Sequence, residues 1–478
     1  MADQSHTTVL RREVLQRVAH AFMQTETADE VEAIPFTMRP KGGKHNHCCI
    51  HHDRAILRYR CMAAMGFLPE DEHGDDSIPL KDFVNKAMIG DRDSASSVIS
   101  ACHIACHGCA QARHFVTDIC QGCIAQPCIL TCHFGAIQVV VHGQAQIDIK
   151  KCRNCGLCQK VCPYSAIVKL SVPCESACPV DAIRKTESGR AEIALDKCIS
   201  CGRCMLACPF GALLMRSEMV DVLRLLREKE HVTAMLSPAT AGQFAIPLPK
   251  IFGAFKALGF SEVMEVAVGA DITSRHEAEE FVERMGKGER FMTTSCCAGY
   301  IQAVRRLIPE LGPFVSDTLT PMHYTAELAA QKAPGTKTVF IGPCVAKCVE
   351  GRENPAVAHV ITFEELGAIF NAANINLDTC SEEALIDSPS STGRKYALSG
   401  GVAAAVSSLV DGRVEVVPVQ VNGLTLKGLR QLRSYAMGVC PGNLVEVMAC
   451  EGGCVGGSGV IADRVKAARA VDAFATGT

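Results

Sequence analysis

The spacing of apolar and polar residues predicts a helical start to the chain. In LRREVLQRVAHAFM, the apolar residues Val14, Leu15, Val18 and Phe22 recur at helical spacing, which predicts an amphipathic helix. A second helix is predicted in AILRYRCMAAMGF. Between them, KGGKHNHCCIHHDR shows no periodicity and is rich in Gly and His, which predicts a loop. Residues 1–100 are therefore treated as an N-terminal helical and irregular region.

From about residue 216 the pattern alternates between helix and strand. Helices are predicted in MVDVLRLLREKE, FGAFKALGF and EAEEFVERMGKG, the last two with a Gly stop. Short apolar runs predict buried strands in HVTAMLSPAT, EVMEVAV, TKTVFIGPC and NLVEVMAC. The last two strands deliver a cysteine at the C-terminal end, where α/β folds place their ligands. Residues 216–478 are therefore predicted to form an α/β domain.

The middle of the chain, residues 101–212, contains a duplication. Six cysteines recur at an offset of 46 residues, namely Cys128, Cys132, Cys152, Cys155, Cys158 and Cys162, followed by Cys174, Cys178, Cys198, Cys201, Cys204 and Cys208. Other positions agree at the same offset, since Ala136–Ile137 matches Ala182–Ile183 and Gly143 matches Gly189. Each copy is predicted to contain two short strands that turn at its Gly.

Composition narrows the class of protein. The chain has 478 residues, enough for two to four structural units, and a formal net charge of −3 that favours neither nucleic acid nor an anionic membrane as a partner. No apolar run is long enough to span a bilayer, and the N-terminal segment does not resemble a secretory signal. A cytoplasmic location is therefore expected, where 28 cysteines indicate metal ligation rather than disulfides.

The repeated cysteines have the spacing of [4Fe–4S] ligands. Such a cluster takes three thiolates from a C-x2-C-x2-C run and a fourth, usually followed by Pro, from the other half of a ferredoxin module. The first copy supplies two ligand sets, Cys152, Cys155 and Cys158 with Cys132, and Cys120, Cys123 and Cys128 with Cys162. The second copy supplies one complete set, Cys198, Cys201 and Cys204 with Cys178. We therefore expect a duplicated ferredoxin-like domain with at least three accessory clusters.

The second copy lacks part of its other ligand set. The positions 46 residues after Cys120 and Cys123 are Ala166 and Lys169, so the expected C-x2-C is missing there. The cysteines that remain of this set are Cys174 and Cys208.

A C-x2-C outside the repeat could complete this fourth cluster. Cys106 and Cys109, in ACHIACHGC, are the candidate ligands, and Cys102 is the rival. The alternative is that the cluster has been lost and its two remaining cysteines are free thiols. Zinc is a poor fit to the whole pattern, because zinc ribbons use pairs of C-x2-C with four ligands in total.

Three later cysteine motifs differ from the repeat: TTSCCAGY, IGPCVAKCVE and EVMACEGGC. Their Gly and small residues allow a bulky inorganic group to approach the backbone. In this order they resemble the three signature motifs of the [FeFe] hydrogenases, over roughly residues 230–465. The arrangement is most similar to the less-studied monomeric, group B-like branch. The resemblance implies ferredoxin-like modules followed by a two-lobed α/β catalytic domain, an α+β and α/β multidomain protein.

The resemblance implies an H-cluster, a [4Fe–4S] cube joined through a cysteine to a two-iron unit that carries CO, cyanide and a bridging azadithiolate. The implied ligands of the cube are Cys297, Cys344, Cys450 and Cys454, with Cys454 bridging. Lys347 matches the lysine that donates to a cyanide, and a cationic donor suits an anionic ligand in an apolar cavity. Met448 matches a methionine that packs beside the two-iron unit.

The resemblance also implies a proton relay, in the order thiol, water, Glu, Ser, Glu, with Arg at the surface. The matching residues are Cys296, Glu350, Ser316, Glu280 and Arg284. Each relay member must both donate and accept a proton, which these side chains can do, and the arginine anchors a carboxylate. The alternative for Glu280 and Arg284 is an ordinary solvated i,i+4 helix pair.

Several positions depart from the family pattern. Met322 stands where a glutamine is usual near the cluster, and Cys348 stands where a second lysine is common. Cys348 is either a packing residue, as we expect, or a redox-active thiol. Elsewhere, a cluster of His and Cys in the loop at residues 45–52 could bind metal, although an ordinary surface loop is expected. Three further cysteines are expected to be buried small apolar residues: Cys61, Cys380 and Cys440.

The leading hypothesis is an [FeFe] hydrogenase that interconverts H2 with two protons and two electrons. The implied partners are H2, protons, a ferredoxin-like electron carrier and the maturases that build the two-iron unit. Two other classes stay open, a hydrogen sensor and a non-catalytic iron–sulfur assembly or electron-transfer protein. Sensors usually carry a signalling domain and assembly proteins lack the full motif set, so retention of Cys296, Lys347 and Glu350 favours the enzyme.

Overall fold

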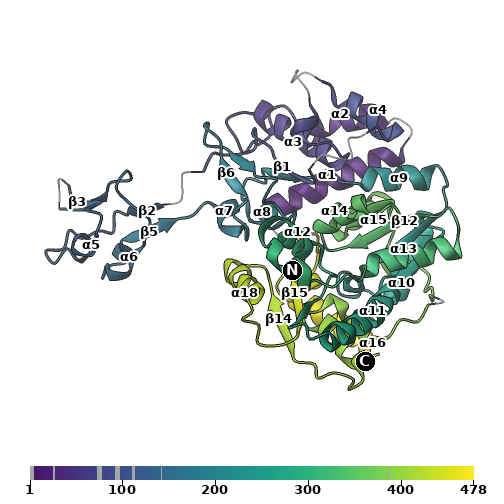
Figure 1. The fold of residues 1–478 in the computed structure, drawn as a ribbon. Coiled ribbons are helices and arrows are strands. Elements are labelled where there is room, and N and C mark those ends of the chain that lie inside the picture. The colour runs from purple at the N-terminus through teal and green to yellow at the C-terminus, as the bar shows by residue number, and fades with distance from the viewer. Residues whose placement is uncertain are drawn as a thin grey trace.

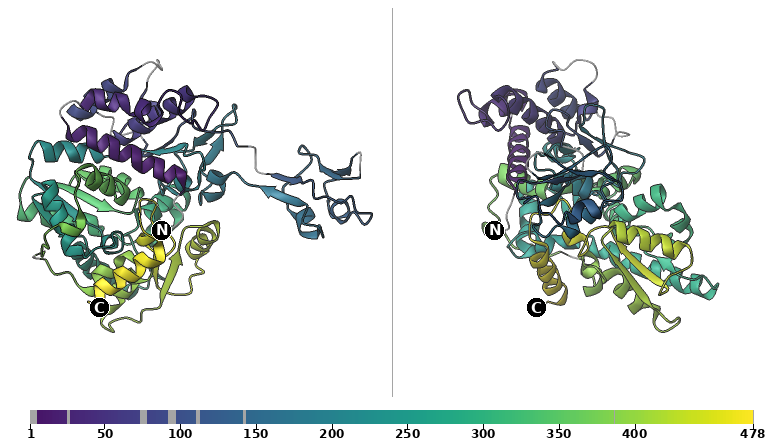
Figure 2. Two further views of the ribbon diagram at one scale, coloured as in Figure 1. Left: turned by 180° about the vertical axis from the view of Figure 1, so that it is seen from behind. Right: turned by 90° about the vertical axis from the view of Figure 1, so that its left-hand side faces the viewer.

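The computed structural model describes residues 5–24, 27–72, 78–91, 97–109, 113–140, 143–385 and 387–477. Helices and strands are mixed along the chain, as predicted. Most elements pack into one body, and a single module around β2, β3 and β5 projects away from it (Figure 1; Figure 2). No helix in the described ranges is long and apolar enough to cross a membrane.

Four helices form the N-terminal region: α1 (His6–Met23), α2 (Thr27–Met38), α3 (Ile50–Ala64) and α4 (Leu80–Ile89). The predicted apolar face of α1 is buried, and the helix packs against α9 (Met219–Arg227) and α15 (Phe363–Ala372) of the C-terminal half. Arg11 and Arg12 of α1 both donate to the carboxylate of Glu364, at 2.9–3.0 Å. The N-terminal region is thus tied to the C-terminal half by an apolar face and by ion pairs.

The duplicated segment forms two similar modules. The projecting one consists of β2 (Arg113–Val116), α5 (Pro127–Leu130), β3 (Ile137–Val139), β4 (Ala145–Ile147), α6 (Leu157–Val161) and β5 (Ile167–Leu170). The other, which lies in the body, consists of β1 (Ile99–Ala101), α7 (Pro173–Ala177), β6 (Ile183–Lys185), β7 (Ala191–Ile193), α8 (Arg203–Ala207) and β8 (Leu213–Met215).

The hairpins of the two modules have the same register. Ile137 pairs with Ile147 in the first, and Ile183 pairs with Ile193 in the second, which confirms the two predicted short strands in each copy. The chain turns at Gly143 and Gly189, where φ is +81° and +78°, a conformation that Gly adopts without steric cost. A second antiparallel pair closes each module, β2 with β5 and β1 with β8.

The C-terminal half contains two parallel sheets. The first has the order β10-β9-β12-β13, with strands Glu262–Glu265, Val232–Leu236, Lys337–Gly342 and His359–Thr362. The second has the order β11-β15-β14, with strands Met292–Thr293, Leu444–Met448 and Pro418–Asn422. The longer helices around them are α10 (Leu248–Leu258), α11 (Ala267–Gly286), α12 (Ala298–Leu307), α13 (Pro321–Lys332), α14 (Ala346–Glu353), α17 (Gly401–Val410), α18 (Leu426–Ala436) and α19 (Arg464–Thr476).

A predicted boundary in the C-terminal half is wrong. The helix predicted from EAEEFVERMGKG begins ten residues earlier, as α11, and the strand predicted in EVMEVAV ends at Glu265. The reason is tertiary, because the small residues at the start of α11 pack tightly against α13. A Cβ atom on Gly269 would lie 2.2 Å from the Pro321 carbonyl oxygen and 2.4 Å from Thr325 Oγ1. This close packing brings α11 beside the cysteines described next.

Candidate functional site

The three C-terminal motifs place their cysteines at the ends of parallel strands. Cys297 follows β11 and precedes α12, Cys344 follows β12, and Cys450 follows β15. Cys454 begins a short 3-10 turn, and a Cβ on the preceding Gly453 would lie 2.6 Å from the Ala397 carbonyl oxygen. Because the carboxyl ends of parallel strands lie at the same edge of a sheet, Cys297 and Cys450 leave the second sheet together, and Cys344 comes to them from the first sheet.

The four thiols lie near one another in the interior. Burial, followed by the charge of Cys297, raises the pKa of Cys344 and of Cys454 to about 12. Burial raises the pKa of Cys450 as well, followed by the charges of the other three. Buried thiols of this kind lose their protons only when a cation replaces them, as metal coordination does. The arrangement fits a metal cluster with four thiolate ligands.

Lys347 supplies a positive charge beside these thiols. Burial disfavours its ammonium group, but Glu350 and then Cys344 outweigh the burial, so the pKa of Lys347 is raised. Its Nζ lies 2.6 Å from Glu350 Oε2, and Thr320 Oγ1 donates to the other oxygen of the same carboxylate. Lys347 is therefore a buried, charged donor held by Glu350.

A cavity of about 60 Å³ lies between Lys347 and the thiols of Cys296, Cys297 and Cys454. The other residues that line the cavity are mostly apolar: Ser237, Pro238, Val266, Ala270, Pro321, Met322, Phe340, Tyr396, Ala397 and Met448. Met448, which the family resemblance implies beside the two-iron unit, is part of this lining. Tyr396 was not predicted; its hydroxyl lies 2.7 Å from Ser274 Oγ, which orients the ring.

Glu277 of α11 is the carboxyl group whose charge affects Cys296 most strongly. Burial raises the pKa of Cys296 well above its ordinary value, and Glu277 is the next largest cause. Burial raises the pKa of Glu277 to about 7, although Ser295 donates to its Oε1 from both N, at 2.9 Å, and Oγ, at 3.2 Å. Its Oε2 is buried and has no hydrogen-bond partner among the described residues. Glu277 is thus a carboxyl that can exchange a proton near neutral pH.

A chain of polar contacts leads from Ser316 through Glu280 to Arg284. Ser316 Oγ donates to Glu280 Oε2 at 2.5 Å, and Arg284 Nη2 lies 2.7 Å from Glu280 Oε1. Arg284 is not an ordinary solvated partner, because its side chain is 11% exposed and also donates to the Pro313 and Val315 carbonyl oxygens. Glu280 is thus held between a buried serine and an anchored arginine.

Glu350 and Ser316 line one pocket, together with Ser295 and Thr320. The family resemblance implies that Glu350 acts between Cys296 and Ser316, but its carboxylate is engaged by Lys347 and Thr320. Glu277 is a second carboxyl at this point, because it accepts from Ser295, the residue before Cys296, and the Ser316 hydroxyl lowers its pKa. Helical spacing could have pointed to Glu277 from the sequence, because it stands three residues before Glu280 and so lies on the same face of the helix.

Three accessory cysteines lie close enough to other cysteines of the proposed sets to be affected by their charge. Burial raises the pKa of Cys128, Cys158 and Cys204, and in each case the charges of the other cysteines of its set raise it further. Those neighbours are Cys123 and Cys162 for the first, Cys152, Cys155 and Cys132 for the second, and Cys201, Cys198 and Cys178 for the third.

Backbone N–H groups donate to the cluster thiols at equivalent positions of the two modules. Ala136 and Ala182 donate to Cys132 and Cys178, Ala166 and Ala212 donate to Cys162 and Cys208, and Asn154 and Ser200 donate to Cys152 and Cys198, all at 3.2–3.5 Å. Each donor pair is separated by 46 residues. These bonds stabilise charge on sulfur, so both modules are built for thiolates.

The same comparison identifies the missing C-x2-C of the second module. Ala145 donates to Cys120 Sγ at 3.5 Å, and Ala191, 46 residues later, donates to Cys106 Sγ at 3.3 Å. Cys106 therefore occupies in the second module the position that Cys120 occupies in the first, which makes Cys109 equivalent to Cys123.

Cys102 occupies a position that is not a ligand in the first module. Its N–H donates to the Ala212 carbonyl oxygen at 2.8 Å, just as the Thr117 N–H donates to the Ala166 carbonyl oxygen at 2.8 Å. Burial raises the pKa of Cys102, which is 1% exposed. The equivalence with threonine favours Cys106 and Cys109 over Cys102 as ligands, with Cys174 and Cys208 completing the set.

Arg60 of α3 is a buried cation beside this set. It is 7% exposed, donates from Nη2 to the carbonyl oxygens of Phe210 and Gly211, and has no ion-pair partner among the described residues. Burial, followed by Arg11, lowers the pKa of Arg60 to about 10, and the charges of Cys102 and Cys208 oppose this change. Arg60 therefore stays charged at neutral pH.

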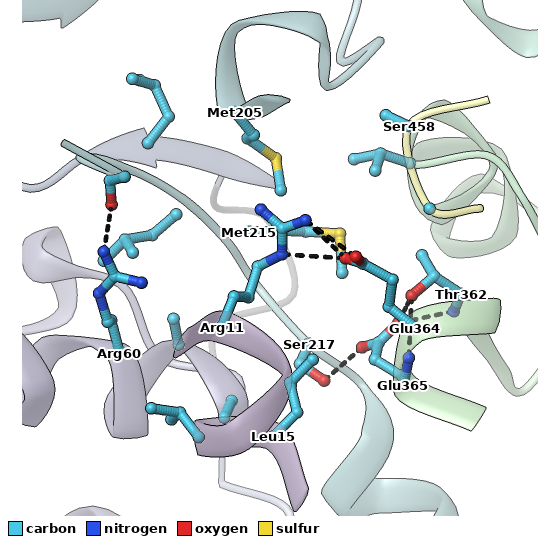
Figure 3. A pocket seen from close by; sticks show the side chains of 18 of the residues that line it. Arg11, Leu15, Arg60, Met205, Met215, Ser217, Thr362, Glu364, Glu365 and Ser458 are labelled. Atoms are coloured by element: carbon cyan, nitrogen blue, oxygen red, sulfur yellow. Dashed lines mark hydrogen bonds and ion pairs between the residues drawn. The ribbon is translucent and has the colours of Figure 1, made fainter. Parts of the chain in front are cut away.

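Arg60 and Arg11 line a cavity of about 50 Å³. It lies between the N-terminal helices, the second module and the C-terminal half, and Figure 3 shows the side chains around it. Arg11 is paired with Glu364 there, whereas Arg60 has only carbonyl partners. The nearby thiols are the negative groups available to Arg60 if they bind a metal cluster.

The remaining cysteines and histidines differ in how far they are buried. Cys61 and Cys348 are buried packing residues, as predicted, whereas Cys380 and Cys440 are only half-buried, because their loops lie near the surface. Of the segment 45–52, only residues 45–49 form a loop, which is mostly exposed, because residues 50–52 already belong to α3; His52 Nε2 contacts the Ile104 carbonyl oxygen at 2.9 Å. Within the described ranges, no three His, Cys, Asp or Glu side chains are placed to hold one metal ion; in a four-iron cube each thiolate binds a different iron, so the thiolates stand farther apart.

Three family models match the chain. Residues 230–458 match the C-terminal domain of the iron only hydrogenase large subunit; residues 145–168 match a 4Fe-4S binding domain; and residues 169–219 match the LdpA Fe-S cluster-binding domain. The last two fall in the projecting module and the second module, respectively.

The similar curated proteins are hydrogenases. Iron hydrogenase 1 of Clostridium pasteurianum is 26% identical over 51% of this chain and 52% of its own length. The NADP-reducing hydrogenase subunit HndD of Solidesulfovibrio fructosivorans is 27% identical over 44% of this chain and 45% of its own. The chain thus spans about half the length of these relatives. Among solved structures, a variant of the apo [FeFe]-hydrogenase HydA1 from Chlamydomonas reinhardtii is 21% identical over 51% of this chain and 84% of its own, with a TM-score of 0.41.

Proposed function

We propose that the chain, whose residues 230–458 match the C-terminal domain of the iron only hydrogenase large subunit, interconverts H2 with two protons and two electrons at an H-cluster. The observation that carries the proposal is the convergence of four cysteine thiols beside a mostly apolar cavity that contains one charged donor, Lys347. Residues 216–478 are taken as the catalytic domain, with the two sheets as its lobes, after the N-terminal region at 1–100 and the ferredoxin-like domain at 101–212.

The residues of this site fit the group. Four soft thiolates suit a [4Fe–4S] cube, and Cys297, Cys344, Cys450 and Cys454 are the proposed ligands. The adjoining cavity would hold the two-iron unit, with Lys347 donating to one of its anionic ligands and Met448 packing against it. When bound, the H-cluster supplies an open iron site and an amine base for heterolytic cleavage of H2.

The chain's own residues then move the proton. We propose that the Cys296 thiol exchanges it at Sγ, that Glu277 passes it on, and that Ser316 and Glu280 carry it toward the surface beside Arg284. A carboxyl with a pKa of about 7 suits the second step, because a relay group works best when its pKa is near the operating pH. The role of Glu350 is to hold Lys347 in place.

Electrons are proposed to pass through four accessory [4Fe–4S] clusters. Cys201 lies close enough to act on the pKa of Cys450, which links the set that contains Cys201 to the catalytic site. Cys174 likewise acts on the pKa of Cys204, which links the fourth set to the third. The fourth cluster is proposed on the equivalence of Cys106 with Cys120.

The proposed partners are H2, protons, a ferredoxin-like electron carrier and the maturases that build the two-iron unit, and the proposed location is the cytoplasm. The test is anaerobic infrared spectroscopy after maturation with a synthetic two-iron precursor. CO and cyanide bands that shift under H2 are the expected result. Intact [4Fe–4S] content without such bands would overturn the proposal in favour of an assembly or electron-transfer protein.

A further inference from the structure

The module that projects from the body exposes an unusual number of apolar side chains. Ten of the 23 large hydrophobic residues that are exposed within the described ranges lie between residues 113 and 170, although this is a small part of the chain. Ile124 and Leu130 are 100% and 80% exposed. Figure 1 and the left view of Figure 2 show the module projecting from the body. Apolar surface concentrated in this way marks an interaction site.

The same module is positively charged in a chain that is negative as a whole. Residues 113–170 contain six Lys or Arg, two Asp and no Glu, which gives a formal charge of +4, whereas the full chain has −3. The remainder of the chain therefore has −7. A compact positive field on a projecting module steers negatively charged partners toward it.

The charges gather at one cysteine loop. Four exposed basic residues flank the exposed Cys155 and have no ion-pair partner among the described residues: Lys150, Lys151, Arg153 and Lys160. Ile149 and Val161, 54% and 37% exposed, lie at the two ends of the same segment. The result is an apolar and basic surface around an exposed cluster ligand.

We propose that this surface, formed by residues 149–161, is the docking site for a small acidic electron-carrier protein. The inference rests on the proposed function and deepens it by identifying which surface meets the carrier and with what charge. An exposed ligand loop brings the cluster close to the surface, which electron transfer requires and nucleic-acid binding does not. A second copy of the same surface is equally basic and would be repelled.

The electron balance is simple. A reduced carrier gives one electron to the cluster of this loop and leaves oxidised, and two such events with two protons account for one H2. In the reverse direction, one H2 reduces two oxidised carriers.

The experiment uses the full chain with all clusters loaded and measures H2 evolution from a reduced acidic [4Fe–4S] ferredoxin. The test variant carries K150E, K151E and R153E. The control variant carries K427E, R430E and K466E, which makes the same change in net charge on exposed positions of the catalytic half. Methyl viologen replaces ferredoxin in a parallel assay, because a small dye needs no protein docking site.

The expected result is a rise of roughly tenfold or more in the KM for ferredoxin in the test variant, together with a weaker dependence of the rate on salt. Its rate with methyl viologen, and both rates of the control variant, should stay unchanged. An unchanged KM in the test variant with normal methyl viologen rates would overturn the docking site and leave the hydrogenase proposal standing. No rate with methyl viologen in the wild-type chain would instead overturn the proposed function.

Two further outcomes would also overturn the inference. One is a concentration-dependent dimer, seen by sedimentation, that the three substitutions abolish without changing the KM for ferredoxin. The other is tight, salt-sensitive binding of duplex DNA that depends on the same residues. If the test variant loses iron, the neutral triple K150Q, K151Q and R153Q takes its place, with a smaller rise in KM expected.

Discussion

Replacement of Glu277 by Gln tests the proton route most directly. Gln keeps the size of the side chain and the oxygen that accepts from Ser295, but it cannot exchange a proton. Removal of one positioned acid–base group typically lowers a rate by about 10² to 10⁴. We therefore expect turnover of H2 to fall by about that factor in Glu277→Gln, while the infrared bands of the H-cluster and their response to H2 are retained.

The same substitution has a calculable effect on stability. Glu277 has an ordinary pKa of 4.5 and a folded-state pKa of about 7, so the folded protein keeps its proton over a pH range in which the unfolded chain has lost it. The carboxyl's contribution is fully present below about pH 4.5, is lost as pH rises toward 7, and is absent above that. The difference amounts to about 3 kcal/mol. Because Gln does not titrate, the variant should gain about that much, relative to wild type, between about pH 4.5 and about pH 8.

The measurements are single-turnover and steady-state H2 assays at matched H-cluster content, with thermal unfolding at both pH values. Glu279→Gln is the matched control, because Glu279 lies on the same helix but is exposed and paired with Arg413. It should change neither turnover nor the pH dependence of stability. Full turnover in Glu277→Gln with intact infrared bands would refute the relay through Glu277, and a pH-independent stability difference would refute its raised pKa.

Three further predictions concern the clusters and the core. Cys106→Ser should lower iron content by about four atoms per chain, as one [4Fe–4S] cluster is lost, whereas Cys102→Ser should not; equal iron content in both would contradict the assigned ligands. Arg60→Gln should lower the potential of the nearest cluster by about 60 mV or more in an EPR-monitored titration, since a buried cation stabilises the added electron; an unchanged potential would argue against their proximity. Arg394→Met should destabilise the fold by about 3–5 kcal/mol in denaturant unfolding, because Glu265, bound at 2.8 and 3.0 Å, would be left buried and unpaired; a loss below about 1 kcal/mol, typical of an exposed pair, would show that water reaches it.

The choice of cofactor was readable from sequence because cluster ligands come from short, local loops. A C-x2-C-x2-C run brings three thiolates together whatever the surrounding fold, and the 46-residue repeat showed which cysteines share a module. The strands that deliver Cys344 and Cys450 were equally visible, since an apolar run that ends in a cysteine places that residue at a sheet edge. These signals depend only on neighbours in the chain.

Contacts between distant segments were decided only by the tertiary structure. Nothing in the local sequence marks Glu277, and it gains its role because the packing of α11 brings its charge close to Cys296. Arg60 likewise meets Cys102 and Cys208 only because α3 packs on the second module. The position of Cys106 followed from its bond with Ala191, 85 residues away, which no local spacing predicts. Burial then shifts the pKa of each such group, so the chemistry of the site depends on packing that the sequence pattern does not contain.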